Sequence, residues 1–364
     1  MPILCYNSII IWEQKHMRKT DIEFKKQMSS LMHKAEQAAK PPFCLFCGEE
    51  SSLCNSHTVP RFILKHIDEK GMVCYGYSLV NYLDNLIDTK KGINNAFNYY
   101  LICRDCDQKQ FAHYEKPESI LDYDHLDDKT KNIVLIEMAL KTHLAHMFRK
   151  AQTYNMNSML FPDVYKKFQE TRHKTAYEID IEDHRRYLID LLCAKEDASI
   201  EFEVLYNKLL DYEVGIATQT IIAYIYDLQG NILFNPHYYS TADSTKYFYL
   251  VILPIEGKTR ILFYIEKQYV PIVKNIVEQF NALTEEEKLH FLFMSLIVYD
   301  EQFYINPILL KTIRKDKKLC KLFVQADSNR GLTKHCKKIK NFRKYNNYLL
   351  NKNPKDNMND KTNN

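Results

Sequence analysis

The chain has 364 residues, of which 46% are hydrophobic and 26% are charged, so it is long enough for two to three domains with packed cores. Only eight glycines occur, and none falls in a Gly-x-Gly-x-x-Gly or Gly-x4-Gly-Lys-Ser/Thr pattern, so the usual sequence support for a dinucleotide site or a Walker-type phosphate loop is missing. No stretch approaches the roughly 20 apolar residues that cross a bilayer, and the apolar run at residues 9–12 lacks the flanks of a signal peptide, so we expect a cytoplasmic protein without a membrane partner.

A helical arm is predicted at the N-terminus, over residues 1–41. Thr20-Asp21-Ile22-Glu23 has the form of a capping box that opens a helix. Apolar residues then recur at steps of three and four, as on one face of a helix, at Phe24, Met28, Leu31, Ala35 and Ala38. Pro41-Pro42 ends this pattern.

Residues 42–117 differ from the rest because they hold six of the ten cysteines. Cys44 and Cys47 form one Cys-x2-Cys pair, and Cys103 and Cys106 form a second. Each pair places two thiolates on one tight turn, and two such turns supply the four soft ligands that a tetrahedral structural zinc prefers. Residues 97–103 are expected to form a short strand, and residues 104–115 the helix that follows it.

The sequence therefore predicts Zn²⁺ held by Cys44, Cys47, Cys103 and Cys106. The alternatives are four buried thiols without a metal, or a ligand set in which Cys54, Cys74 or His57 replaces one of the four.

Residues 118–310 are expected to form a helix and antiparallel-sheet domain. Periodicity predicts, in chain order, a helix of about twenty residues around 133–147, a helix around 188–192, a strand over 214–226, a hairpin of strands 247–253 and 260–266, a helix over 272–280, and a helix opened by the capping box of Thr284 and Glu287.

The basic charge is concentrated near the C-terminus, in a segment predicted to be helical over residues 311–350. The net charge is +4, yet residues 311–352 alone carry +12, which leaves −8 for the remainder. This asymmetry indicates a polyanion partner or a solubilising tail. The side chains expected to contact nucleic-acid phosphates are Lys334, Lys337, Lys338, Lys340, Arg343 and Lys344. Phe342, Tyr345 and Tyr348 either stack on bases or dock this segment on the core. Residues 351–364 are expected to be disordered.

Between the two cysteine pairs lies Ser56-His57-Thr58-Val59-Pro60-Arg61-Phe62. Together with Leu101-Ile102-Cys103-Arg104-Asp105-Cys106-Asp107, and with Phe111 and Glu115 beyond it, this segment resembles bacterial HNH-like endonucleases. The resemblance covers about 75 residues. It implies a ββα-metal module of the treble-clef type, and so an α+β fold in which this zinc module is followed by the helix and sheet domain.

The resemblance also implies roles for single residues. His57 matches the general base that deprotonates water for attack on a phosphodiester. Asp107 stands where the family usually has Asn, in the first helical turn and facing the strand of His57, and would help to hold a catalytic Mg²⁺ or Mn²⁺ ion. His113 is a weaker match to the final His of the motif, with Lys109 as an alternative. Ser56 is a departure, because active members commonly have Asp, Glu or His before the base.

These inferences lead to one hypothesis and one alternative. The hypothesis is a metal-dependent HNH-type endonuclease that hydrolyses DNA, with RNA as another candidate substrate, in bacterial defence or mobile-element biology. The alternative, favoured by Ser56, is a catalytically inactive zinc-stabilised module that binds nucleic acid or protein. Whether the chain acts with a partner protein or as a homodimer stays open.

Overall fold

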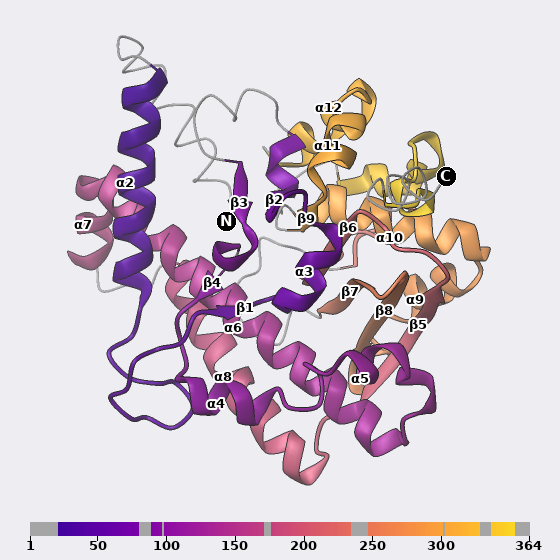
Figure 1. The fold of residues 1–364 in the computed structure, drawn as a ribbon, viewed down its shortest axis with the longest axis horizontal. Helices are drawn as coiled ribbons and strands as arrows, with labels where there is room; N and C mark the ends of the chain where they lie inside the picture. Colours follow the sequence, from indigo (N-terminus) through magenta and orange to yellow (C-terminus); the bar gives the residue numbers. More distant parts are fainter. Residues whose placement is uncertain are drawn as a thin grey trace.

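A computed structural model describes residues 21–79, 89–96, 98–170, 176–233, 247–300, 303–327 and 336–353 (Figure 1). The helices are α2 (Asp21–Ala39), α3 (Arg61–Ile67), α4 (Arg104–Gln110), α5 (Pro117–Leu121), α6 (Asp128–Leu160), α7 (Pro162–Glu170), α8 (Ala176–Asp197), α9 (Lys274–Asn281), α10 (Glu285–Tyr299), α11 (Pro307–Ile313) and α12 (Lys317–Asp327). The strands are β1 (Ser56–His57), β2 (Met72–Tyr75), β3 (Lys90–Gly92), β4 (Asn98–Tyr99), β5 (Phe202–Leu210), β6 (Ile216–Ile222), β7 (Phe248–Ile255), β8 (Lys258–Glu266) and β9 (Tyr304–Ile305). The 3-10 helices include η7 (Cys336–Lys344) and η8 (Tyr348–Leu350).

A seven-stranded antiparallel sheet forms the middle layer, in the order β3-β2-β9-β6-β7-β8-β5. Its β7–β8 hairpin has the two-residue turn Glu256-Gly257. Both turn residues have positive φ, 48° and 78°, a conformation that matches the twist of the flanking strands and that Gly257 adopts at no steric cost. A separate pair, β1 and β4, belongs to the site described below. The fold is therefore mixed helix and antiparallel sheet, as predicted.

Helices cover both faces of the sheet (Figure 1). One core packs α9, α10 and α12 against the face that carries Leu250, Ile252 and Phe263. The other core packs α3, α6 and α8 against the opposite face, which carries Tyr249, Val251 and Tyr264. The alternation of side chains along β7 and β8 divides these two cores, because neighbouring residues of a strand point to opposite faces.

Several predicted elements are confirmed. The helix after Thr20 is α2, and the hairpin is β7–β8. The Thr284–Glu287 capping box opens α10, with the Thr284 side chain and the Glu287 carboxylate bonding each other's backbone N–H.

Other elements differ in length. The helix around 133–147 is 33 residues long, since α6 runs through the centre of the molecule and is buried along much of its length. The helix expected over 104–115 ends at Gln110, because the backbone N–H groups of His113 and Tyr114 bind the carboxylate of Glu137 instead of continuing the helix. Of the strand expected over 97–103, the described residues form β4 and, at Cys103, an isolated antiparallel bridge with Leu53, and Cys103 then stands at the head of α4.

The two regions that the sequence separates at residue 117 share one sheet. β2 and β3 come from the cysteine-rich region and join the sheet through β9. Buried Asn306, which caps α11, donates a hydrogen bond to the Ile67 carbonyl oxygen at 3.0 Å. The C-terminal stretch is also tied in as far as Asn353, whose backbone N–H donates to the Glu213 carbonyl oxygen; residues 354–364 of the expected disordered tail lie outside the described ranges.

Candidate active site and metal centre

Four cysteine thiols converge at the end of the molecule where α4 begins. The Sγ atoms of Cys44, Cys47, Cys103 and Cys106 all lie within 4.8 Å of one another. Tetrahedral zinc with Zn–S bonds of about 2.3 Å places its sulfurs about 3.8 Å apart, and the Cys47 and Cys103 sulfurs are 3.9 Å apart. In the part of the chain that the structure describes, this is the only such cluster of potential ligands. The four thiols are thus positioned as in a zinc site.

Local hydrogen bonds build the two turns that carry these thiols. Gly48, with φ of 76°, donates its N–H to the Cys44 carbonyl oxygen and closes the first turn. Leu45 donates to the carbonyl oxygen of Leu101, which ties the first turn to the second. Cys103 stands at the N-cap of α4, and its N–H donates to the Cys44 sulfur at 3.3 Å. The two pairs are therefore linked directly, in spite of the 55 residues between them.

The electrostatics of the cluster favour a bound cation. Burial raises the pKa of the Cys44 thiol, but N–H groups of Cys47, Cys103 and Phe46 together lower that pKa to about 7. Burial and the neighbouring thiols raise the pKa of Cys106. One thiolate at this site thus opposes the formation of the others, and a divalent ion removes that repulsion. The four-sulfur donor set fits zinc. The alternative ligands lie elsewhere: the Cys54 sulfur contacts the Ser56 hydroxyl at 3.1 Å, and Cys74 is buried in β2.

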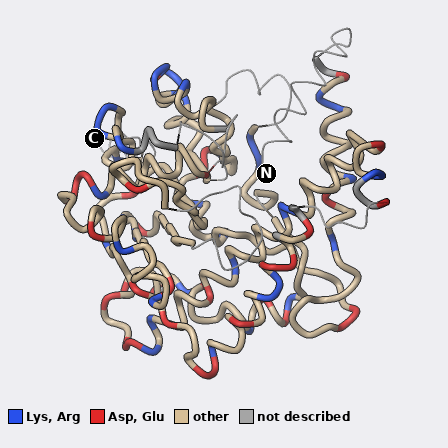
Figure 2. Tube along the Cα trace, turned by 180° about the vertical axis from the view of Figure 1, so that it is seen from behind, with Lys and Arg blue, Asp and Glu red and all other residues tan. Residues whose placement is uncertain are grey.

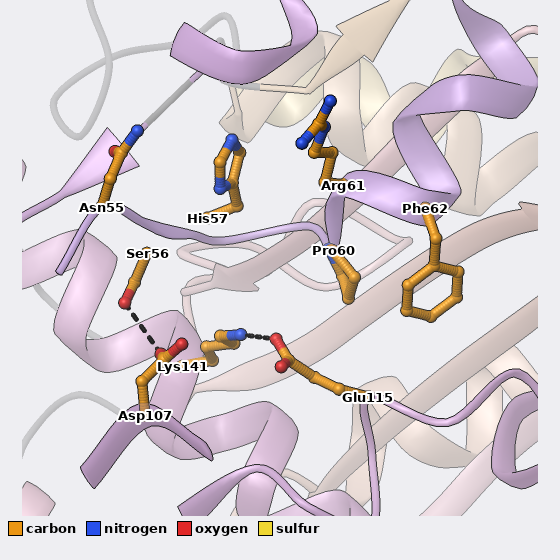
Figure 3. Close-up of a pocket in the computed structure, with 9 residues that line it drawn as sticks. All are labelled: Asn55, Ser56, His57, Pro60, Arg61, Phe62, Asp107, Glu115 and Lys141. Carbon is orange, nitrogen blue, oxygen red and sulfur yellow. Dashed lines mark hydrogen bonds and ion pairs between the residues drawn. The ribbon is translucent and has the colours of Figure 1, made fainter. Parts of the chain in front are cut away.

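Strand β1 carries the histidine of the motif next to this cluster. It pairs with β4, Ser56 opposite Tyr99 and His57 opposite Asn98. Ser56 is buried, and its hydroxyl donates to Asp107 Oδ1 at 2.8 Å, so Asp107 faces β1 from the first turn of α4, as expected. Figure 3 shows Ser56 directed towards Asp107 and His57 directed to the other side of β1. Neighbouring residues of a strand point to opposite sides, so Asp107 meets Ser56 and not the imidazole of His57, and the predicted pairing of that imidazole with the Asp107 carboxylate is not observed.

His57 is held in one tautomer. Its Nε2 lies 3.1 Å from the carbonyl oxygen of Ile93. Since a carbonyl oxygen only accepts, Nε2 carries the proton and Nδ1 keeps its lone pair. Burial lowers the pKa of His57, and the charges of Lys141 and Arg61 lower it further against the opposing effects of the Ile93 carbonyl and Asp107. The imidazole is therefore neutral near pH 7, with one nitrogen able to take a proton.

A cavity of about 260 Å³ unites the residues of the motif. It is lined by Asn55, Ser56, His57, Pro60, Arg61, Phe62, Asp107, Glu115 and Lys141 (Figure 3). All but Lys141 come from the segment 55–62 or from residues 107 and 115, so the two halves of the sequence motif meet here.

Lys141 was not identified from the sequence. It projects from the middle of α6, is 1% exposed, and pairs its ammonium group with Glu115. Burial lowers its pKa to about 8, while the charge of Asp107 opposes that shift, so the group stays largely protonated at pH 7. The signal in the sequence is a lysine among apolar residues of a predicted helix, between Leu140 and Leu144.

A catalytic Mg²⁺ or Mn²⁺ at Asp107 does not fit this arrangement. Such ions need several oxygen ligands in an open shell. Here Asp107 accepts the Ser56 hydroxyl, and the carboxylate of Glu115 is paired with Lys141. The ammonium group of Lys141 pairs with Glu115, and the charge of Asp107 also acts on it (Figure 3).

His113 lies outside the cavity lining. Its Nδ1 is 2.8 Å from Glu137 Oε1, and the fully buried Glu137 carboxylate also accepts from Lys195 and from the backbone N–H groups of His113 and Tyr114. This network fixes the chain just before Glu115. Lys109, the alternative to His113, is exposed on α4.

The basic segment is described in part. Lys334 lies outside the described residues, and of Lys337 and Lys338 only the backbone, in η7, is described. Lys340, Arg343 and Lys344 are exposed, and Arg343 Nε is 2.6 Å from Glu287. Figure 2 shows Lys and Arg gathered near the described C-terminal end. The aromatic rings of Phe342 and Tyr348 are buried against α10, so they dock the segment on the core.

No family model, curated protein or solved structure matches the chain. Within the described ranges, no helix combines the length and the apolar character that a membrane crossing needs.

Proposed function

We propose that the chain is an HNH-type endonuclease that hydrolyses DNA phosphodiester bonds, on a scaffold stabilised by one zinc ion at the four cysteines. The observation that carries this proposal is the state of His57. One ring nitrogen donates to Ile93, the other is left as a proton acceptor, and the same cavity holds Arg61 and the residues of the motif. The zinc would join the turn of Cys44 and Cys47 to the start of α4, the helix of Asp107.

In the proposed reaction, His57, Arg61 and Asp107 have separate roles. The Nδ1 atom of His57 takes a proton from water, and the water oxygen forms a new bond to phosphorus. The bond from phosphorus to the bridging oxygen breaks, and that oxygen takes a proton from solvent. The guanidinium of Arg61, which is exposed at the start of α3, binds the phosphate oxygens. Asp107 accepts a hydrogen bond from Ser56 and so fixes the position of β1 relative to α4.

Plasmid nicking tests this proposal. Purified zinc-loaded protein is incubated with supercoiled plasmid in the presence of Mg²⁺, of Mn²⁺ or of neither, and with an RNA substrate in parallel. His57→Ala is expected to lower the nicking rate at least about 100-fold, the usual effect of losing a general base. His33→Ala, an exposed histidine on α2, is the matched control and is expected to keep the full rate. Equal rates in wild type and His57→Ala reject the proposal.

A second candidate is the non-cleaving module that binds nucleic acid or protein through the same surface. The Ser56–Asp107 hydrogen bond favours it, because Ser56 supplies neither a carboxylate nor an imidazole at the position before His57. DNA binding measured by fluorescence anisotropy, without nicking under any of the three metal conditions, supports this candidate over the endonuclease.

A further inference from the structure

We propose that Lys141 is the built-in cation of the phosphate pocket, so that the pocket binds a nucleic-acid phosphodiester without a divalent metal ion. This inference rests on the proposed function for the identity of the ligand. Its structural basis is the position of the ammonium group, which is paired with Glu115 and lies on the cavity wall.

The charges of the cavity balance without a metal. Arg61 and Lys141 are positive, Asp107 and Glu115 are negative, and the other lining residues are uncharged when His57 is neutral. A divalent ion would add two positive charges beside a buried ammonium group, and like charges at short range in a buried site repel strongly. A phosphodiester, which carries one negative charge, instead meets the ammonium group of Lys141 on the cavity wall.

Lys141 has little freedom to leave this place. Its side chain is 2% exposed, and its Nζ atom lies 4.6 Å from the centre of the Phe111 ring. The helix that carries it is held in place by contacts with α2, α8, β4 and β6. Glu115 is fixed in turn by the neighbouring contacts of Glu137 with His113 and Tyr114.

A buried ammonium group can stabilise the negative charge of a phosphate. Lysine and arginine side chains stabilise the charge of phosphoryl groups in water-excluded sites, as a metal ion does. The Lys141–Glu115 pair holds the ammonium group at the pocket in the absence of ligand, so no reorganisation is needed when a phosphate arrives. Lys141 is therefore assigned as a residue that contacts the phosphate.

Binding of Mn²⁺, measured by the electron paramagnetic resonance signal of the free ion, tests this assignment without using activity. Zinc-loaded wild type is expected to bind no stoichiometric Mn²⁺ at millimolar concentrations. Lys141→Met, which keeps the side-chain volume and removes the charge, leaves Glu115 without its partner in a cavity that then holds two carboxylates and no buried ammonium group, and is expected to gain one Mn²⁺ site. Lys195→Met is the matched control, because it also removes a lysine paired with a glutamate, at Glu137, but outside the cavity, and no Mn²⁺ site is expected.

Each outcome is informative. One Mn²⁺ bound by wild type, and lost in Asp107→Asn, overturns the inference while it leaves the endonuclease proposal intact. Lys141→Met that folds, by circular dichroism and zinc content, yet gains no Mn²⁺ also overturns it. If Lys141→Met does not fold, the wild-type titration can still overturn the inference, by showing one bound Mn²⁺. Nicking by wild type in metal-free buffer, with a dependence on Mn²⁺ in Lys141→Met, supports both proposals. A gain of the Mn²⁺ site without any nicking keeps Lys141 as the pocket cation and rejects the endonuclease.

Discussion

At the scale of single residues, the site depends on which hydrogen-bond partner each polar side chain takes. His57 gives its one N–H to a backbone carbonyl, and Ser56 gives its hydroxyl to Asp107. Glu137 accepts four donors in a fully buried place and holds the segment that leads to Glu115. The chemistry of the pocket thus depends on residues that lie outside it as well as on those that line it.

The pH dependence of activity follows from His57. Burial lowers its pKa below the ordinary value of about 6.5. The neutral imidazole is the active base, so kcat/KM for plasmid nicking is expected to rise with pH through a midpoint below 6.5 and to be flat at pH 7. A pH series of initial rates measures this limb. A midpoint above 6.5 contradicts the assignment of His57 as the base.

Loss of the Glu137 carboxylate is expected to destabilise the fold. Glu137→Gln replaces two accepting oxygens by one and leaves Lys195 without its buried counter-charge. Breaking a buried pair in this way costs about 3–5 kcal/mol in the free energy of unfolding, measured by urea denaturation. Glu118→Gln, at an exposed position on α5, is the control and is expected to change that free energy by less than about 0.5 kcal/mol. A similar small change in Glu137→Gln would show that the network is dispensable.

At the scale of elements, α6 organises the molecule. It carries Glu137 and Lys141 towards the motif residues, and His143 towards α8 and the sheet. His143 Nδ1 is 2.7 Å from His184 Nδ1, and its Nε2 is 2.8 Å from the Tyr249 hydroxyl. One helix therefore connects the pocket, the second core and the sheet face.

These buried histidines make the stability of the fold depend on pH. Burial first, and then the neighbouring His184, lower the pKa of His143 and of His146 well below 6.5. The unfolded chain binds protons at these groups below about pH 6.5 while the folded chain does not, so the free energy of unfolding falls as the pH drops from 7 towards 5.

The variant His143→Gln is expected to flatten this dependence by up to about 1.4 kcal/mol per pH unit, the effect of one proton. Urea denaturation at a series of pH values measures the slope, with His33→Gln as the exposed control. An unchanged slope in His143→Gln would mean that this histidine is not kept neutral by the fold.

At the scale of the whole molecule, the cysteine-rich region and the larger domain form one continuous structure. β2 and β3 are two strands of the seven-stranded sheet. Near the C-terminus, the backbone N–H of Asn353 donates to the Glu213 carbonyl oxygen, just before β6. Phe342 and Tyr348 are buried and attach the basic segment to the core, so the backbone that carries its exposed lysines is held in place.

DNA affinity is expected to depend on salt through this segment. The double variant Lys340→Gln/Lys344→Gln is expected to reduce the slope of log affinity against log salt by about 0.9 for each phosphate that the protein no longer neutralises. Fluorescence anisotropy at several salt concentrations gives the slope, and Lys129→Gln, exposed near the start of α6, is the control. If the double variant keeps the wild-type slope, DNA is bound elsewhere.

The sequence predicted features whose causes are local. Helix α2, the β7–β8 hairpin, the capping box of α10 and the convergence of the two cysteine pairs follow from spacing, turn residues and side-chain chemistry. It did not predict Lys141 in the pocket, because the burial of a lysine on α6 depends on Glu115, 26 residues earlier in the chain. Nor did it predict that β2 and β3 join the large sheet, since that pairing depends on β9, more than 200 residues later.

The most direct test of the account is the zinc content of the purified full chain, measured by inductively coupled plasma mass spectrometry. One zinc per chain is expected, and its loss is expected in Cys103→Ser/Cys106→Ser, because that variant removes two of the four sulfurs that lie within 4.8 Å of one another. A wild-type protein that holds no zinc, with all four thiols open to titration, would contradict the metal-linked arrangement from which the pocket is built.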